Sequence, residues 1–367
     1  LIITEYIKLV GRKKESGEVQ VNYRTKNLIN ISVVVLIFIV MTVYFLAVDG
    51  IDNIISVLKT VNISWALIGL ALIILYWLLE ALCLYIVEKK IYKKQKFINS
   101  LKVSMIGQLF NSLTPFSSGG QPMQAVAMKC EGKSVSKSAT ILLIKFIVYQ
   151  ATLVIYTALI LIFEYSYFRN SVSGFVKLAI IGFIVNFLVI VTLILIGAKK
   201  SIVLKFLSFI YKLLGKIKIL KNLDKKIEEL RKSVDTFHEN FKIIKKEKIM
   251  VLKLFLATAL QLTVFFSITY AVYKMFGLSG TTYIKIISAQ SFLSMVMAFV
   301  PIPGAGIAAE GGFYIIFGAF IPKEVINMAI LFWRLYTFYL PIIVGSLFML
   351  KMNKKENLLL EAEKEEG

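Results

Sequence analysis

The sequence predicts an all-α, polytopic membrane protein with six full spans and two re-entrant broken segments in an inverted-topology repeat, plus a cytoplasmic helical hairpin. Three observations support this fold class. The 367-residue chain is 58% hydrophobic and has a mean hydropathy of +0.77, far above the values of a soluble domain. It contains several apolar runs of about 20 residues, the length that crosses a bilayer. Two further apolar stretches are broken by proline and glycine at matching places in the two halves of the chain.

The apolar runs divide the chain in order. The six predicted spans cover roughly residues 28–48, 65–87, 138–163, 174–197, 250–276 and 326–350. The two broken segments cover roughly residues 98–128 and 282–321. We therefore expect one membrane domain at 28–350, preceded by a basic cytoplasmic arm at 1–27 and followed by a charged cytoplasmic tail at 351–367.

Lysine and arginine indicate the orientation, because loops rich in these residues stay in the cytoplasm. They are dense in the arm, after the second span, after the first break, in the stretch 199–249 and at the start of the tail. The other loops offer only Lys59, Arg169 and Lys323. All basic loops share one side if both broken segments are re-entrant, so both termini are predicted to be cytoplasmic. The first broken segment then enters from the cytoplasm and the second from the outer face, which makes an inverted repeat.

The net charge of +21 at pH 7 is interpreted in the same way. In a membrane protein, basic loops that face anionic lipid explain it better than binding to nucleic acid. No metal site, cofactor or disulfide is expected, because His238 is the single histidine, Cys83 lies within a span and Cys130 lies in a loop. Phosphate-binding loops, nucleophile elbows and dinucleotide fingerprints are missing from the sequence, so we assign no catalytic residue.

An insertion at 199–249, between the fourth and fifth spans, is predicted to be a cytoplasmic amphipathic hairpin. Its apolar stripe recurs at spacings of three and four, at Leu220, Leu223, Ile227, Leu230, Val234, Phe237, Phe241 and Ile244. We interpret the hairpin as packed on itself or on the membrane surface, with a dimer contact or a docking site for a cytosolic partner as the alternative. His238 lies on its polar side and is expected to be solvated.

The two breaks are where we expect function. The first runs from Thr114 to Pro122 and the second from Pro301 to Gly312. Irregular backbone is tolerated at membrane depth only around a cavity or inside protein, and paired breaks mark the binding sites of transporters. Helix N-termini at Gly119–Gly120 and Gly304–Gly306 are predicted to present unpaired amides and a positive dipole end, which suits a phosphodiester.

Ionisable residues inside apolar segments are costly, and for that reason they are functional candidates. Glu80, Lys145 and Arg334 lie within predicted spans, and Glu310 lies within the second break. Two interpretations stay open. Either Glu80 forms a structural ion pair with Lys145 or Arg334, or these residues contact the headgroup of a lipid. A pocket that carries both signs of charge suggests a zwitterionic or aminoacylated lipid.

Several short motifs together resemble a known family. They are Gly107-Gln-Leu-Phe-Asn111, Thr114-Pro115, Gly119-Gly120, Pro303-Gly304, Gly306, Glu310 and Phe332-Trp-Arg-Leu-Tyr336, followed by Pro341 and Gly345. From about residue 28 to residue 350, the chain resembles the lysylphosphatidylglycerol synthase transmembrane region, the flippase-like domain of the multiple peptide resistance factor. This resemblance implies a polytopic bacterial membrane domain that moves aminoacylated phosphatidylglycerol to the outer leaflet.

The resemblance also has limits. Full-length members carry a soluble C-terminal domain that transfers lysine from lysyl-tRNA to the lipid, whereas this chain stops at Gly367 after a short charged tail, so we expect it to lack that domain. Many relatives have an acidic residue after the first pair of glycines. This chain has Gln121 there, which argues against a grip on a cationic lysyl group at that point.

The predicted function is translocation of an anionic or aminoacylated phospholipid, such as lysylphosphatidylglycerol, across the bacterial cytoplasmic membrane. The predicted headgroup-binding residues are Glu80, Gln108, Asn111, Thr114, Gly119, Gly120, Gln121, Lys145, Pro303, Gly304, Gly306, Glu310 and Arg334. The expected partners are the phospholipid and either a separate cytosolic synthase or a second copy of the chain. The alternatives are lysyltransferase activity with lysyl-tRNA docked on the basic face, and an accessory role in a glycolipid pathway.

Overall fold

The computed structural model describes residues 59–171, 246–297 and 306–350, together with isolated positions that lie chiefly between 180 and 192. Every regular element in these residues is a helix. Four of the helices are long and apolar enough to cross a membrane: α4 (Ile63–Ile91), α7 (Val135–Ser171), α11 (Lys248–Met275) and the helix Lys323–Leu350 that begins with α14 (Lys323–Arg334). They correspond to four of the six predicted spans.

The remaining predicted parts fall outside the described residues or are described only at isolated positions. The predicted span at 174–197 is described only at isolated positions. The parts that lie outside the described residues are the span at 28–48, nearly all of the insertion at 199–249, the predicted arm and nearly all of the predicted tail. These parts therefore stay predictions.

Helices α4 and α11 form the centre of the bundle, since α4 packs more extensively on α11 than on any other described element. Asn62 caps the start of α4 by accepting a hydrogen bond from the backbone amide of Trp65 at 3.3 Å. The backbone amide of Asn62 also donates to the carbonyl of Met275 at 2.8 Å. The start of α4 therefore lies beside the end of α11, and the two helices run antiparallel.

Two pairs of short helices lie where the broken segments were predicted. The first pair is α5 (Phe97–Leu113) and α6 (Gly120–Cys130), joined through the 3₁₀ turn η2 (Pro115–Ser117). The second is α12 (Tyr283–Met297) and α13 (Gly306–Phe317), and the residues between them lie outside the described part. None of the four helices exceeds 17 residues, which is below the roughly 20 residues of a full span.

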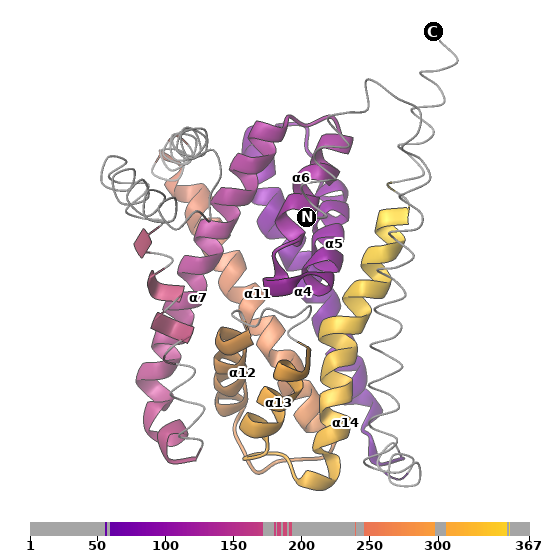
Figure 1. Ribbon diagram of the computed structural model, residues 1–367, viewed down its shortest axis with the longest axis vertical. Coiled ribbons are helices and arrows are strands. Elements are labelled where there is room, and N and C mark those ends of the chain that lie inside the picture. The colour runs from indigo at the N-terminus through magenta and orange to yellow at the C-terminus, as the bar shows by residue number, and fades with distance from the viewer. Residues whose placement is uncertain are drawn as a thin grey trace, which may run out of the picture.

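The two pairs lie in opposite halves of the bundle. Figure 1 shows α5 and α6 in the upper half and α12 and α13 in the lower half, with the long helices passing both. An inverted repeat would place the two pairs in this way, and the repeat itself stays a prediction. Entry of the two pairs from opposite faces of the membrane stays a prediction.

Buried apolar side chains form two main clusters, one towards each end of the bundle. Ile73 and Trp77 of α4 belong to the cluster that contains α12 and α13, whereas Cys83, Leu84 and Val87 belong to the cluster that contains α5 and α6. The residues of α11 and of Lys323–Leu350 divide between the two clusters in the same way. The middle turns of the long helices are therefore where the apolar core is interrupted.

The last long helix changes its geometry in this middle region. A π-helical turn, η4 (Leu335–Tyr339), follows α14, and the amide of Leu340 donates to the carbonyl of Leu335. Pro341 has no N–H to donate to the carbonyl of Thr337, so the regular ladder of α-helical hydrogen bonds is interrupted here. Turns of this kind are frequent at functional sites.

Candidate functional site

A cavity of about 540 Å³ occupies the space between the two apolar clusters. Side chains from both halves of the chain line it, including those of α4, α5, α6, α7, α11, α12 and the helix that begins with α14. Among the described residues of this wall, Glu80, Lys145 and Arg334 are charged. The cavity therefore collects most of the ionisable residues that the apolar segments contain.

Glu80 forms the first buried ion pair of the site. Its carboxylate accepts a short hydrogen bond from Lys145 Nζ of α7, and its other oxygen accepts from Gln261 Nε2 of α11 at 2.6 Å. Three helices thus meet at one carboxylate. Of the two partners that the sequence left open for Glu80, the structure shows Lys145.

Arg334 forms the second ion pair, with Glu310 of α13. Arg334 Nε lies 3.0 Å from Glu310 Oε1, and the guanidinium lies over the rings of Trp333 and Phe338 at 5.1 and 5.3 Å. Arg334 lines the cavity, whereas Glu310 is not part of its wall. The cation therefore faces the cavity, whereas its carboxylate partner does not line it.

The first break closes on itself and does not leave its amides free. Thr114 Oγ1 donates to the carbonyl of Phe110 at 2.6 Å and accepts from the amide of Gly119 at 2.8 Å. Asn111 Oδ1 accepts from the amide of Gly120 at 3.1 Å. The prediction of unpaired amides at Gly119–Gly120 is therefore wrong, because side chains at the end of α5 already cap the start of α6.

Glycine is required for this closure. A Cβ atom built on Gly120 would lie 2.1 Å from Asn111 Oδ1 and 2.7 Å from the carbonyl oxygen of Gly107. The turn before it is also unusual, because Phe116 and Ser117 have positive φ angles of 55° and 50°. Non-glycine residues in this region store strain of about 1–3 kcal/mol each, and such strain concentrates at binding sites. Both residues line the cavity.

The structure separates the predicted headgroup residues into three groups. Those that line the cavity are Glu80, Gln108, Asn111, Gln121, Lys145 and Arg334. Those outside its wall are Thr114, Gly119 and Gly120, which close the first break, and Glu310, which pairs with Arg334. Of the second break, Gly306 is the first residue of α13, whereas Pro303 and Gly304 lie outside the described residues.

Tyrosine and amide side chains complete the wall, and the tyrosines, Tyr76 and Tyr149, were not among the predicted site residues. Gln108 Nε2 donates to Tyr76 Oη at 3.3 Å, and Gln150 Nε2 donates to Asn186 Oδ1 at 3.2 Å. Tyr149 also lines the cavity, one helical turn after Lys145. Spacing by four residues from a charged residue, as in Tyr76 and Glu80 or Lys145 and Tyr149, is the signal that identifies these positions on the same helix face.

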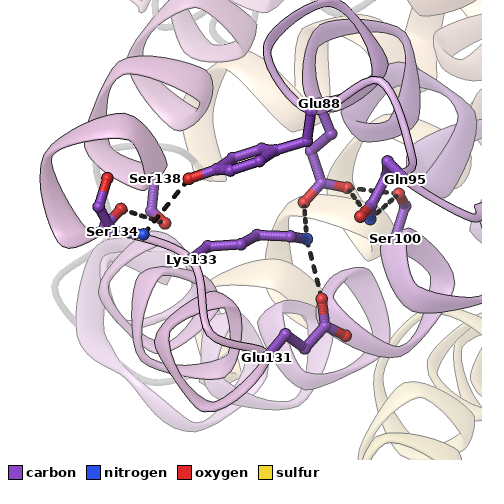
Figure 2. Close-up of polar contacts among 8 residues, drawn as sticks. Glu88, Gln95, Ser100, Glu131, Lys133, Ser134 and Ser138 are labelled. Carbon is purple, nitrogen blue, oxygen red and sulfur yellow. Dashed lines mark hydrogen bonds and ion pairs between the residues drawn. The ribbon is translucent and has the colours of Figure 1, made fainter.

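Another buried ion pair, between Glu88 and Lys133, lies outside the cavity, at the opposite end of α4 from Asn62. Glu88 accepts from Lys133 Nζ at 2.6 Å and from Gln95 Nε2 at 2.9 Å, and also from the Ser100 hydroxyl. Figure 2 shows Glu88 between Lys133 on one side and Gln95 and Ser100 on the other. Lys133 Nζ also lies 2.8 Å from Glu131 Oε2. This cluster ties the loop before α7 to the ends of α4 and α5.

Together, the fold and the cavity define a polytopic membrane protein with a polar, charged chamber inside its helical bundle. A family model described as the lysylphosphatidylglycerol synthase TM region matches residues 29–345. The chain belongs to this family, which confirms the resemblance found in its motifs. A UPF0104 membrane protein of Archaeoglobus fulgidus is 26% identical to it over 294 residues, which cover 80% of this chain and 88% of that protein.

Proposed function

We propose that the chain translocates a phospholipid across the membrane by holding its headgroup in the central cavity while the acyl chains stay in the bilayer. The observation that carries this proposal is a cavity of about 540 Å³ with Glu80, Lys145 and Arg334 in its wall. Charged residues inside a membrane bundle are costly and mark pathways for polar substrates. A membrane lipid is the polar substrate that membership of this family favours.

Both signs of charge in the cavity suit a phospholipid headgroup. The phosphodiester would bind Lys145 or Arg334, and a cationic substituent would bind Glu80. An aminoacylated lipid such as lysylphosphatidylglycerol would then exchange the ion pair between Glu80 and Lys145 for two ion pairs with the lipid. That exchange leaves neither Glu80 nor Lys145 buried without a partner, which is the outcome that costs most in a low-dielectric site.

The arrangement of the short helices supports movement by alternating access. In many secondary transporters, one repeat rocks against the other around a site at the middle of the membrane. Here, α5 and α6 lie in one half of the bundle and α12 and α13 in the other (Figure 1), with the cavity wall drawn from three of these four helices. We propose that the basic loops face the cytoplasm, as the positive-inside rule predicts, and that both termini lie there.

Lipid movement in vesicles tests the proposal. The purified chain is placed in phosphatidylcholine vesicles with a trace of phosphatidylglycerol that is labelled on an acyl chain, and the label in the outer leaflet is quenched with an impermeant reductant. We expect the wild-type protein to speed exchange between leaflets by about tenfold or more over protein-free vesicles. Equal rates would contradict the proposal.

A cavity-filling variant tests the route. Ser294 of α12 lines the cavity, so Ser294→Trp is expected to remove most of the acceleration by occupying the headgroup space. Ile284, on the same helix, is 56% exposed on the outside of the bundle, so Ile284→Trp is the matched control and should leave the rate unchanged. Loss of activity in both variants, or in neither, would contradict a route through the cavity.

A further inference from the structure

We propose that Glu80 couples lipid movement to a proton, taking up one proton when the phosphodiester of an anionic lipid displaces it from Lys145. This inference rests on the proposed function and adds an ion to it. The protein would then carry an anionic phospholipid and a proton together. A headgroup that brings its own ammonium group would need no proton.

The contacts of Glu80 single it out for this role. Lys145 is the cation that bonds to it directly, and Gln261 supplies its other hydrogen bond. Both Glu80 and Lys145 line the cavity, so a phosphate that enters there reaches the ammonium group and cavity water reaches the carboxylate. Glu310, the other carboxylate of the site, lies outside the wall and pairs with Arg334.

Among the described residues, few other ionisable groups face this carboxylate. On α4 itself they are Tyr76 and Cys83, and on α7 they are Lys145 and Tyr149. On α11 its contact is the neutral Gln261, with the Cys83 thiol bonded to Thr258 beside it. The described cavity residues of α5, α6 and α12 are amides, hydroxyls and apolar groups, and Arg334 is the charged residue of the last helix in the wall. Among these groups, Lys145 is the positive charge that pairs with Glu80.

The charge balance follows from this geometry. Before binding, Lys145 and Glu80 neutralise each other, and the lipid carries one negative charge. After binding, Lys145 neutralises the phosphodiester, and Glu80 keeps only the hydrogen bond from Gln261. An unpaired carboxylate in a buried site is disfavoured relative to its neutral acid, so it takes a proton from the water of the cavity. Lys145, Glu80 and the phosphodiester then carry no net charge together, as Lys145 and Glu80 do before the lipid binds.

The test is whether a pH gradient redistributes lipid between leaflets. Phosphatidylcholine vesicles with labelled phosphatidylglycerol are prepared with the outside more acidic than the lumen by about one pH unit. Coupled movement of one proton with each lipid is expected to enrich phosphatidylglycerol in the inner leaflet by about tenfold at equilibrium. A lumenal pH dye should report acidification during this movement, and lysylphosphatidylglycerol should show neither response.

Variants separate coupling from movement. Glu80→Gln cannot take up a proton, so the distribution of phosphatidylglycerol between leaflets is expected to lose its response to pH, whatever the rate of exchange. Glu88 is the matched control, because it is also buried on α4 and paired with a lysine but lies outside the cavity. Glu88→Gln should keep the full response. Glu131→Gln, a change at a more exposed member of the same cluster, replaces it if Glu88→Gln does not fold.

The outcomes distinguish the two proposals. If the wild-type protein moves lipid but its distribution ignores the pH gradient, or if Glu80→Gln responds like wild type, the proton coupling is wrong and the lipid translocation stands. If the wild-type protein moves no lipid, the proposed function falls and the coupling falls with it. A response to pH that phosphatidylglycerol and lysylphosphatidylglycerol share equally would also overturn the assignment to Glu80.

Discussion

Replacement of Lys133 by methionine is expected to lower the free energy of unfolding by about 3–5 kcal/mol, because it would leave the Glu88 carboxylate buried without its cation. Glu88 is fully buried, and Lys133 is 8% exposed. Gln95 and Ser100 would remain as hydrogen-bond donors to Glu88, but neither carries a compensating charge. The measurement is an unfolding titration of the purified protein in mixed micelles.

Two further variants show whether the loss comes from the unpaired charge. Lys137 is exposed and lies over the Tyr92 ring at 5.5 Å, so Lys137→Met, four residues away, should change the stability by no more than about 0.5 kcal/mol. The double variant Lys133→Met with Glu88→Met should recover most of the loss, since apolar replacement of a whole buried pair is often neutral. A Lys133→Met protein as stable as wild type would show that the pair does not hold this end of the bundle.

Replacement of Arg334 by methionine is expected to slow lipid movement by about 10- to 100-fold, the value of one charge-assisted hydrogen bond to the headgroup. The same variant should also be less stable, because Glu310 would lose its partner. Slower lipid movement in Arg334→Met would therefore follow from either a structural role or a binding role of Arg334. A second variant is needed, and both its lipid movement and its stability are measured.

The double variant Arg334→Met with Glu310→Met separates these roles. It removes both charges, so it should regain most of the stability but none of the lipid movement. Lys323→Met, at the exposed start of the same helix, is the control and should leave both quantities unchanged. Recovery of lipid movement together with stability would mean that the ion pair holds the bundle and does not contact the lipid.

The long helices were the most predictable part of the fold. An apolar run of about 20 residues has few alternatives to a membrane-spanning helix, because backbone groups must be hydrogen-bonded within the segment. The predictions at 65–87, 138–163, 250–276 and 326–350 therefore match described helices. The positions of Glu80, Lys145 and Arg334 in apolar surroundings identified three cavity residues for the same physical reason.

The partners of these residues were less predictable, because pairing depends on how helices face one another. The sequence did not decide between Lys145 and Arg334 for Glu80, and it did not show that Thr114 and Asn111 cap the helix after the break. Glu88 and Lys133 were also missed. In the sequence they stand among charged residues at the end of a span, where a solvated surface is the ordinary interpretation.

Photo-crosslinking from the headgroup shows where the lipid lies in the wild-type protein. Phosphatidylglycerol with a diazirine on its glycerol is incorporated into vesicles that contain the protein, and labelled peptides are identified by mass spectrometry. A headgroup held in the cavity predicts labelling of cavity residues such as Tyr149 and Thr337, which excess unlabelled phosphatidylglycerol should suppress. Labelling confined to the helix ends and to the exposed outer face would contradict it.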